Sequence, residues 1–129
     1  DEEIELLTEY KNMMEAVEEL YRQGVKIVAV TLGGNGAYIY NKEGGCMVPG
    51  FTVEHVADTN GAGDSFWGGF LYKISQSDKQ LDELTQSELA EYARFGNAVA
   101  SLCVEKKGAI PAMPKLSQVE KRLEDSRWK

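Results

Sequence analysis

Residues 58–64, DTNGAGD, gather two aspartates, an asparagine and two glycines within a short segment. Glycine has no Cβ, so Gly61 and Gly63 allow a loop backbone to approach a ligand closely. Apolar residues then recur at helical spacing at Phe66, Trp67, Phe70, Leu71 and Ile74. This spacing predicts a helix that begins near Ala62 and buries Trp67, Phe70 and Leu71 in the core.

The start of this helix is a candidate site for phosphoryl transfer. The first N–H groups of a helix have no intrahelical partner, and with the positive end of the helix dipole they form an anion site. Asp64 would lie in the first turn, where its carboxylate can take a hydroxyl proton while the N–H groups stabilise a transferring phosphoryl group. A plain loop in which Asp64 only complements the dipole also fits, and the local sequence leaves both interpretations open.

Other ion- and nucleotide-binding motifs fail on spacing. An EF-hand loop starting at Asp58 would need an Asp or Asn and then a Glu where the chain has Ala62 and Gly69. No G-x-x-x-x-G-K-[ST] sequence occurs, which excludes a P-loop. The dinucleotide fingerprint G-x-G-x-x-G is also absent, because Ile39 and Phe66 stand where the third glycine is needed.

The 129-residue chain has the composition of one globular domain, with 43% hydrophobic and 27% charged residues. Its net charge of −7 argues against nucleic acid or an anionic membrane as a partner. No apolar run approaches the roughly 20 residues that span a bilayer. Cys46 and Cys103 form no C-x-x-C pair and no signal-peptide pattern occurs, so we expect a reduced, cytoplasmic protein.

Hydrophobic periodicity predicts both helices and strands. Helices are expected at residues 3–23, 62–74, 89–104 and 116–123. Strands are expected at 26–32, 37–41 and 46–51, with turns at 33–36 and 42–45. The first strand is apolar and β-branched without alternation, which predicts burial on both of its faces. A helix followed by such a strand indicates α/β layering.

Four stretches of the chain resemble the ribokinase-like (PfkB) carbohydrate kinases. DTNGAGDSFWGGFL is similar to the family signature D-T-x-[GA]-A-G-D-x-F, and VTLGGNGAYIY is similar to its T-L-G-x-x-G hairpin. VPGFTVEHVADTNGAGD resembles the run that leads into the signature, and FGNAVASLCVEKKGAIPAMP resembles the family's closing helix and loop. The resemblance covers essentially the whole chain, and the amino-acid sequence of these stretches is most similar to that of bacterial fructokinases.

The resemblance implies an α/β fold, namely the C-terminal portion of the ribokinase-like three-layer α/β/α architecture. Residues 1–129 would be the nucleotide-binding portion of a sugar kinase, without the N-terminal sugar-binding and lid part. The expected function is that of an ATP-dependent carbohydrate kinase of fructokinase type, inactive as an isolated fragment. Two alternatives stay open: a kinase of the same fold for a nucleoside or vitamin alcohol, and a non-catalytic nucleotide-binding module. Apolar surface next to the absent part could pair two copies as a homodimer.

The resemblance also implies roles for individual residues. Asp64 matches the catalytic base that activates the acceptor hydroxyl. The anion hole for the transferring phosphoryl group corresponds to Gly61, Ala62 and Gly63. The hairpin that lines the adenosine of ATP corresponds to Thr31, Leu32, Gly33, Gly34, Asn35 and Gly36. Asn97 matches a position near the adenine.

Two cation sites are implied in the same way. Glu3 matches the glutamate of an N-x-x-E motif that organises Mg²⁺ and phosphate, and the asparagine of that motif would stand one residue before Asp1. A monovalent-cation site, which takes K⁺ in some members, corresponds to Asp58, Asn60, Cys103, Lys106, Gly108 and Ala112. Backbone carbonyls would be the ligands at Cys103, Lys106 and Gly108, and Ala112 replaces a serine of some members.

Overall fold

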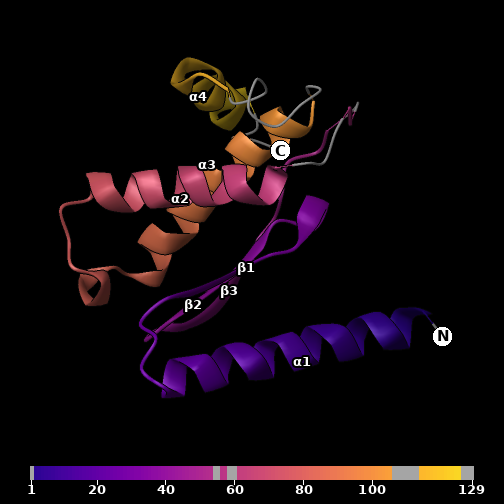
Figure 1. The fold of residues 1–129 in the computed structure, drawn as a ribbon, viewed down its shortest axis with the longest axis vertical. Coiled ribbons are helices and arrows are strands. Elements are labelled where there is room, and N and C mark those ends of the chain that lie inside the picture. The colour runs from indigo at the N-terminus through magenta and orange to yellow at the C-terminus, as the bar shows by residue number, and fades with distance from the viewer. Residues whose placement is uncertain (1, 54–55, 58–60, 106–113, 126–129) are drawn as a thin grey trace.

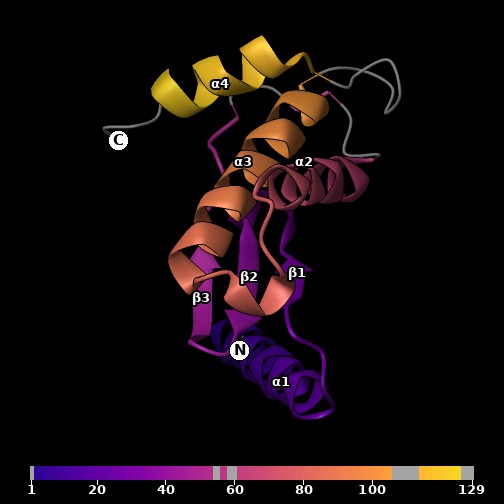
Figure 2. The same cartoon turned by 90° about the vertical axis from the view of Figure 1, so that its left-hand side faces the viewer.

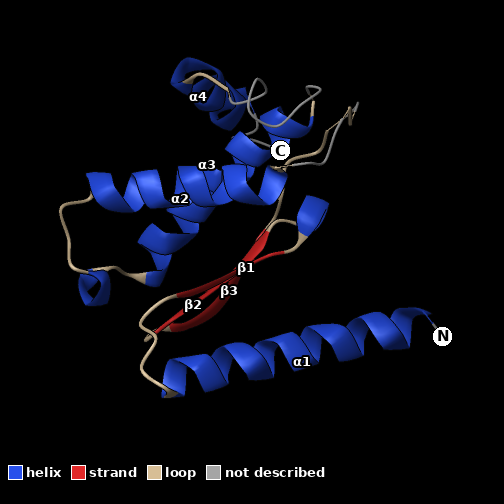
Figure 3. Ribbon diagram, in the orientation of Figure 1, coloured by secondary structure: helices blue, strands red, loops and turns tan. Residues whose placement is uncertain are grey.

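The computed structural model describes residues 2–53, 56–57, 61–105 and 114–125, and side chains from residue 8 onward within these ranges. The helices are α1 (Glu2–Arg22), α2 (Ala62–Gln76), α3 (Gln86–Val104) and α4 (Leu116–Asp125), as Figures 1 and 3 show. Two short 3₁₀ turns, η1 (Gly33–Asn35) and η2 (Leu81–Glu83), lie in the connections. The four expected helices are therefore confirmed.

The strands β1 (Val28–Thr31), β2 (Ala37–Asn41) and β3 (Gly44–Val48) form one antiparallel sheet in the order β1-β2-β3. The register pairs Val30 with Tyr38 and Ile39 with Cys46. Successive side chains of a strand point to opposite faces, so β2 contributes residues to a hydrophobic cluster on each face of the sheet. Ile39 packs with the buried residues of α2 and α3, whereas Tyr38 packs with Val17 of α1.

This alternation produces three layers. α1 lies along one face of the sheet, and α2 and α3 lie on the opposite side, as the two views in Figures 1 and 2 show. α4 packs onto α3, where Val119 joins the cluster of Phe95, Ala98 and Val99. The predicted α/β/α layering is confirmed. None of the helices in the described ranges is long and apolar enough to cross a bilayer.

The first strand is shorter and less buried than the sequence predicts. Val28 is buried, but Ala29 and Val30 are only half-buried and Thr31 is exposed. Among the described residues β1 pairs with β2 alone, so it is an edge strand whose outer side is open. The predicted burial on both faces of this strand is therefore wrong in this structure.

The third strand begins at Gly44, inside the segment expected to be a turn, and ends at Val48, before the expected end at Phe51. The aromatic ring of Tyr38 explains the glycine within the strand. Its hydroxyl group occupies the space that a Cβ on Gly45 would need. A glycine in a strand commonly marks such a close approach.

The face that α2 buries differs from the predicted one at two positions. Its buried residues are Ser65, Phe66, Gly69 and Phe70. Trp67 and Leu71 lie on the neighbouring row of the helix and are 38% and 55% exposed, so their predicted place in the core is wrong. The spacing of apolar residues predicts that a helix forms here. It does not show which of the two adjacent apolar rows of the helix is buried.

Candidate functional site

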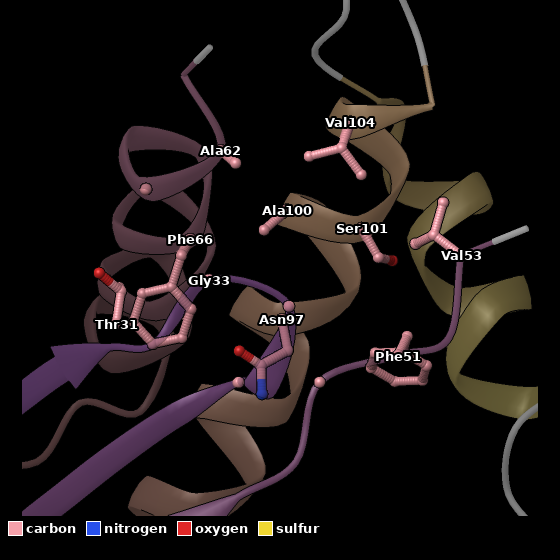
Figure 4. A pocket seen from close by; sticks show the side chains of 14 residues that line it. Thr31, Gly33, Phe51, Val53, Ala62, Phe66, Asn97, Ala100, Ser101 and Val104 are labelled. Atoms are coloured by element: carbon pink, nitrogen blue, oxygen red, sulfur yellow. The ribbon is translucent and has the colours of Figure 1, made fainter. Parts of the chain in front are cut away.

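A cavity of about 260 Å³ lies where the η1 turn, the segment after β3, the start of α2 and the C-terminal half of α3 meet (Figure 4). Its walls are mainly glycine and apolar side chains. Seven predicted site residues line it, and they come from three separate parts of the chain: Thr31, Gly33, Gly34, Gly36, Ala62, Gly63 and Asn97. The fold therefore brings together in one place residues that are up to 66 positions apart, from Thr31 to Asn97.

Backbone conformation and close backbone contacts explain why glycines occupy the turn at residues 33–36. Gly33 and Gly36 have φ values of 57° and 101°, in the left-handed region that favours glycine. A Cβ on Gly36 would meet the carbonyl oxygen of Val48. A Cβ on Gly50 would lie 2.5 Å from the carbonyl oxygen of Gly34, so two backbone segments touch here without side chains between them.

Two predicted residues of this turn lie on its other side. Leu32 packs with the cluster around Val17 and Tyr38, which belongs to the α1 face of the sheet. The Nδ2 atom of Asn35 donates a hydrogen bond to the Tyr10 hydroxyl of α1 at 3.4 Å. Neither residue lines the cavity. Their side chains anchor the turn to α1 instead.

The start of α2 forms the other side of the cavity. Gly61 is the N-cap residue in a left-handed conformation with φ of 79°, and its carbonyl oxygen accepts a hydrogen bond from the Ser65 N–H at 2.8 Å. Ala62 and Gly63 line the cavity from the first turn. The helix therefore begins where predicted, and the N–H groups of its first turn and its positive dipole end lie at the cavity. Asp64 follows in the same turn and is exposed.

α3 supplies the remaining wall through Asn97, Ala100, Ser101 and Val104. Asn97 is only 6% exposed and donates hydrogen bonds from Nδ2 to the carbonyl oxygens of Val48 and Pro49, each at 3.1 Å. Ser101 donates to the carbonyl oxygen of Ala98 at 2.8 Å and accepts a hydrogen bond from Nη1 of Arg122 at 3.0 Å. This polar network fixes the wall without presenting a charge to the cavity.

Sequence reasoning missed seven of the lining residues as site residues: Gly50, Phe51, Val53, Phe66, Ala100, Ser101 and Val104. The pair Pro49-Gly50 was the one available signal, because such dipeptides mark a bend in the chain. Ala100 is predicted only as one of several small residues in the helix at 89–104. No local pattern indicates that these positions meet the glycine turn.

The predicted cation sites are mostly outside the described residues. This holds for Asp58, Asn60, Lys106, Gly108 and Ala112 and for the side chain of Glu3, although Glu3 itself lies in α1. Cys103 is buried in α3, away from the cavity lining, and its carbonyl oxygen accepts the Glu105 N–H. Within the part of the chain that the structure describes, no group of three His, Cys, Asp or Glu residues could hold a metal ion.

The site therefore combines a cavity with mainly apolar and glycine walls and a helix N-terminus at one side. An apolar slot accommodates a flat heterocycle, and a helix N-terminus accommodates phosphate. These features lie on three α/β/α layers, so the chain is an α/β protein with a cavity at the N-terminus of a helix.

The chain belongs to the pfkB family of carbohydrate kinases, whose family model matches residues 1–116. It is 37% identical over 125 residues to fructokinase-1 of Oryza sativa subsp. japonica, a match that covers 96% of this chain and 38% of the rice protein. The chain thus spans about a third of the length of the curated relatives it matches.

Solved structures of the family agree with the fold. The fructokinase of Xylella fastidiosa with bound ATP superposes with a TM-score of 0.79 at 30% identity, over 88% of this chain and 36% of that one. A fructokinase double mutant from Vibrio cholerae O395, in its fructose-, ADP- and potassium-bound form, gives a TM-score of 0.75 at 28% identity. That match covers 84% of this chain and 34% of the Vibrio chain.

Proposed function

We propose that this chain is the nucleotide-binding, C-terminal portion of an ATP-dependent carbohydrate kinase of fructokinase type. The observation that carries the proposal is the meeting of the helix start at Ala62 and Gly63 with the glycine turn and Asn97 around one cavity. The family membership and the fructokinase names of its relatives support a sugar as the acceptor.

In this proposal the adenosine of ATP lies in the cavity between the turn of residues 33–36 and α3. The phosphates extend toward the start of α2, where the N–H groups of Gly61, Ala62 and Gly63 stabilise the charge of the transferring phosphoryl group. Asp64 takes the proton of the sugar hydroxyl as its oxygen bonds to the γ-phosphorus. The bond from the γ-phosphorus to the bridging oxygen breaks, and ADP leaves.

Asp64 is suited to this role by its position. It is exposed in the first turn of α2, beside the residues of the anion hole, so an acceptor hydroxyl can reach it from solvent. A module that only binds nucleotide does not need a carboxylate at this point, because its negative charge weakens the attraction for phosphate. The exposed carboxylate therefore supports catalysis over the non-catalytic alternative.

The proposal includes two cations, Mg²⁺ and K⁺, whose predicted ligands lie mostly outside the described residues. Mg²⁺ would neutralise phosphate charge, and Glu3 is the residue of this chain predicted to help hold it. The described side chains offer no carboxylate cluster for such an ion. K⁺ is proposed for the site around Asp58 and Cys103, and the potassium-bound form of the Vibrio fructokinase supports K⁺ as the ion.

Nucleotide binding is tested by calorimetric titration of the chain with ADP in the presence of Mg²⁺. Two variants of α2 form a matched pair, because a Cβ on Gly63 or Gly68 would have no atom within 4 Å, and of the two only Gly63 lines the cavity. We expect Gly63→Val to lower the ADP affinity by about tenfold or more and Gly68→Val to leave it unchanged. Equal effects in both variants would contradict this location.

Catalysis is tested in a chimera in which this chain replaces the matching third of rice fructokinase-1. We expect the chimera to phosphorylate fructose, and Asp64→Asn in it to lower kcat by about 10²- to 10⁴-fold, because the general base is lost. ADP affinity should change little. An Asp64→Asn chimera with unreduced kcat would exclude Asp64 as the base.

A further inference from the structure

Asn97 uses its side-chain amide to hold a distant segment of backbone. Both N–H groups of a primary amide are available as donors, and the two oxygens within reach of Nδ2 are the carbonyls of Val48 and Pro49, each at 3.1 Å. Since both partners are acceptors, the amide nitrogen and not its oxygen has to face them. Figure 4 shows the side chain reaching from α3 with its nitrogen and oxygen pointing in different directions.

The segment that Asn97 holds forms one wall of the cavity. Gly50 follows directly after Pro49, and Gly50 and Phe51 line the cavity opposite the start of α2. The spacing between this wall and the turn is fixed by backbone contact. A Cβ on Gly50 would lie 2.5 Å from the Gly34 carbonyl oxygen and 3.1 Å from the Gly36 nitrogen.

Apart from the packing of Phe51 against the cluster of Phe95, Ala98 and Val99, few other contacts hold this wall. The pairing of β3 with β2 ends at Val48, opposite Ala37. Among the described residues, no backbone–backbone hydrogen bond reaches residues 49–53. One turn before Asn97 on α3, the Arg94 guanidinium carbon lies 4.9 Å from the centre of the Phe51 ring. The two hydrogen bonds of Asn97 are thus the main polar link between the segment and the helix.

We propose that Asn97 is a positioning residue, whose amide holds residues 48–51 against the glycine turn and thereby sets the width of the cavity. It acts on the ligand through the backbone of Gly50 and Phe51 rather than through a donated hydrogen bond of its own. The part of this inference that concerns affinity rests on the proposed nucleotide function.

The variant Asn97→Asp separates this role from that of a direct ligand. Aspartate keeps an acceptor oxygen but loses both N–H donors, and its carboxylate would face two carbonyl oxygens. Asn41→Asp is the matched control: Asn41 is also buried, at 3% exposure, and its Nδ2 donates to the Leu84 carbonyl oxygen at 3.1 Å. Asn41 does not line the cavity.

The first measurement is a ¹H–¹⁵N NMR spectrum of each ligand-free chain. We expect Asn97→Asp to shift the backbone amide signals of Gly34, Gly36, Gly50 and Phe51, and Asn41→Asp to leave these four in place. This readout does not depend on nucleotide binding, so it tests the positioning role even if the proposed function is wrong. Unshifted signals in a folded Asn97→Asp chain would overturn the inference.

The second measurement compares ADP with inorganic tripolyphosphate by calorimetry. We expect Asn97→Asp to weaken ADP binding by about tenfold or more and tripolyphosphate by less than about threefold, because the anion site on α2 is untouched. ADP affinity within about threefold of the original chain would overturn the inference.

A second variant guards against loss of folding in Asn97→Asp. Gly50→Ala leaves Asn97 in place but pushes the same segment away from Gly34, because the new Cβ meets backbone. We expect it to reproduce both the amide shifts at Gly34 and Gly36 and the loss of ADP affinity. If Gly50→Ala keeps the original ADP affinity, the position of this wall does not control binding and the inference fails.

Discussion

Gly96 of α3 lies directly against the backbone of Phe66 in α2. A Cβ on Gly96 would be 2.8 Å from the Phe66 carbonyl oxygen, and a Cβ on Gly69 would be 3.1 Å from the Gly96 Cα. The two helices therefore approach each other at glycine positions. Since α2 and α3 each supply part of the cavity wall, this close approach also brings the start of α2 to Asn97.

Replacing Gly96 with alanine tests this helix contact. The new methyl group meets backbone that cannot rotate away, so we expect Gly96→Ala to lower the free energy of unfolding by roughly 1–3 kcal/mol. Gly68→Ala is the matched control, because nothing lies within 4 Å of its Cβ position in α2. That control should raise the free energy of unfolding by up to about 1 kcal/mol. Urea denaturation measures both, and a stabilised Gly96→Ala chain would contradict the packing.

The start of α3 is held by a capping box between Thr85 and Glu88. The Glu88 N–H donates to Thr85 Oγ1 at 3.1 Å, and the Thr85 N–H donates to Glu88 Oε1 at 3.1 Å. We expect Thr85→Ala to lower the free energy of unfolding by about 1 kcal/mol. Gln86→Ala, one position into the helix, is the control and should change it by less than about 0.5 kcal/mol. Equal changes in the two variants would argue against the cap.

The capping box of Thr85 and Glu88 also predicts that the stability of the folded chain decreases at acid pH. The Lys79 ammonium, bonded to Glu88 Oε2 at 2.7 Å, holds the pKa of that carboxyl below its ordinary value, and the Thr85 N–H adds to this effect. A lowered folded-state pKa contributes stability above the unfolded pKa, and that stability is lost as pH falls through the folded value. Glu88→Gln should therefore flatten the acid side of the stability profile measured by thermal unfolding. An unchanged profile would contradict the assignment.

Arg122 attaches α4 to the end of α3. Its Nη2 lies 2.5 Å from Glu105 Oε1 and its Nη1 donates to Ser101, which lines the cavity. Because the side chains of Arg122 and Glu105 are only 22% and 33% exposed, we expect Arg122→Ala to cost about 1–2 kcal/mol of unfolding free energy. Hydrogen exchange should become faster throughout α4. The exposed ion pair of Arg22 with Glu18 is the control, and Arg22→Ala should change stability by less than about 1 kcal/mol.

Local sequence features predicted the parts of the site that depend on local chemistry. The helix start near Ala62 and the turn at residues 33–36 follow from glycine conformation and helical spacing, and both are confirmed. The choice between Phe66 and Trp67 as the buried row of α2 could not be predicted, because it depends on how the helix packs against α3 and the sheet. The wall formed by Gly50 was missed for the same reason, since its partner Gly34 is distant in the sequence.

The orientation of single turn residues was equally out of reach. The resemblance predicts that Asn35 and Leu32 line the adenosine, yet their side chains contact α1 and not the cavity. An alternating pattern over so short a turn does not tell which side faces a ligand. Tyr38 and Gly45 give a second example, because the need for glycine at position 45 comes from a cross-strand contact that neither segment reveals by itself.

The most direct test of the central claim is an NMR titration of the ¹⁵N-labelled chain with ADP and Mg²⁺. The account predicts saturable shifts at the backbone amides of Gly33–Gly36, Ala62 and Gly63 and at the Asn97 side-chain amide. Signals of α1 residues distant from the turn, such as Tyr21, which contacts Tyr40 at the far end of β2, should stay in place. A folded chain whose cavity signals do not move at high ADP concentration, or whose shifts gather elsewhere, would contradict the assignment of this cavity as the nucleotide site.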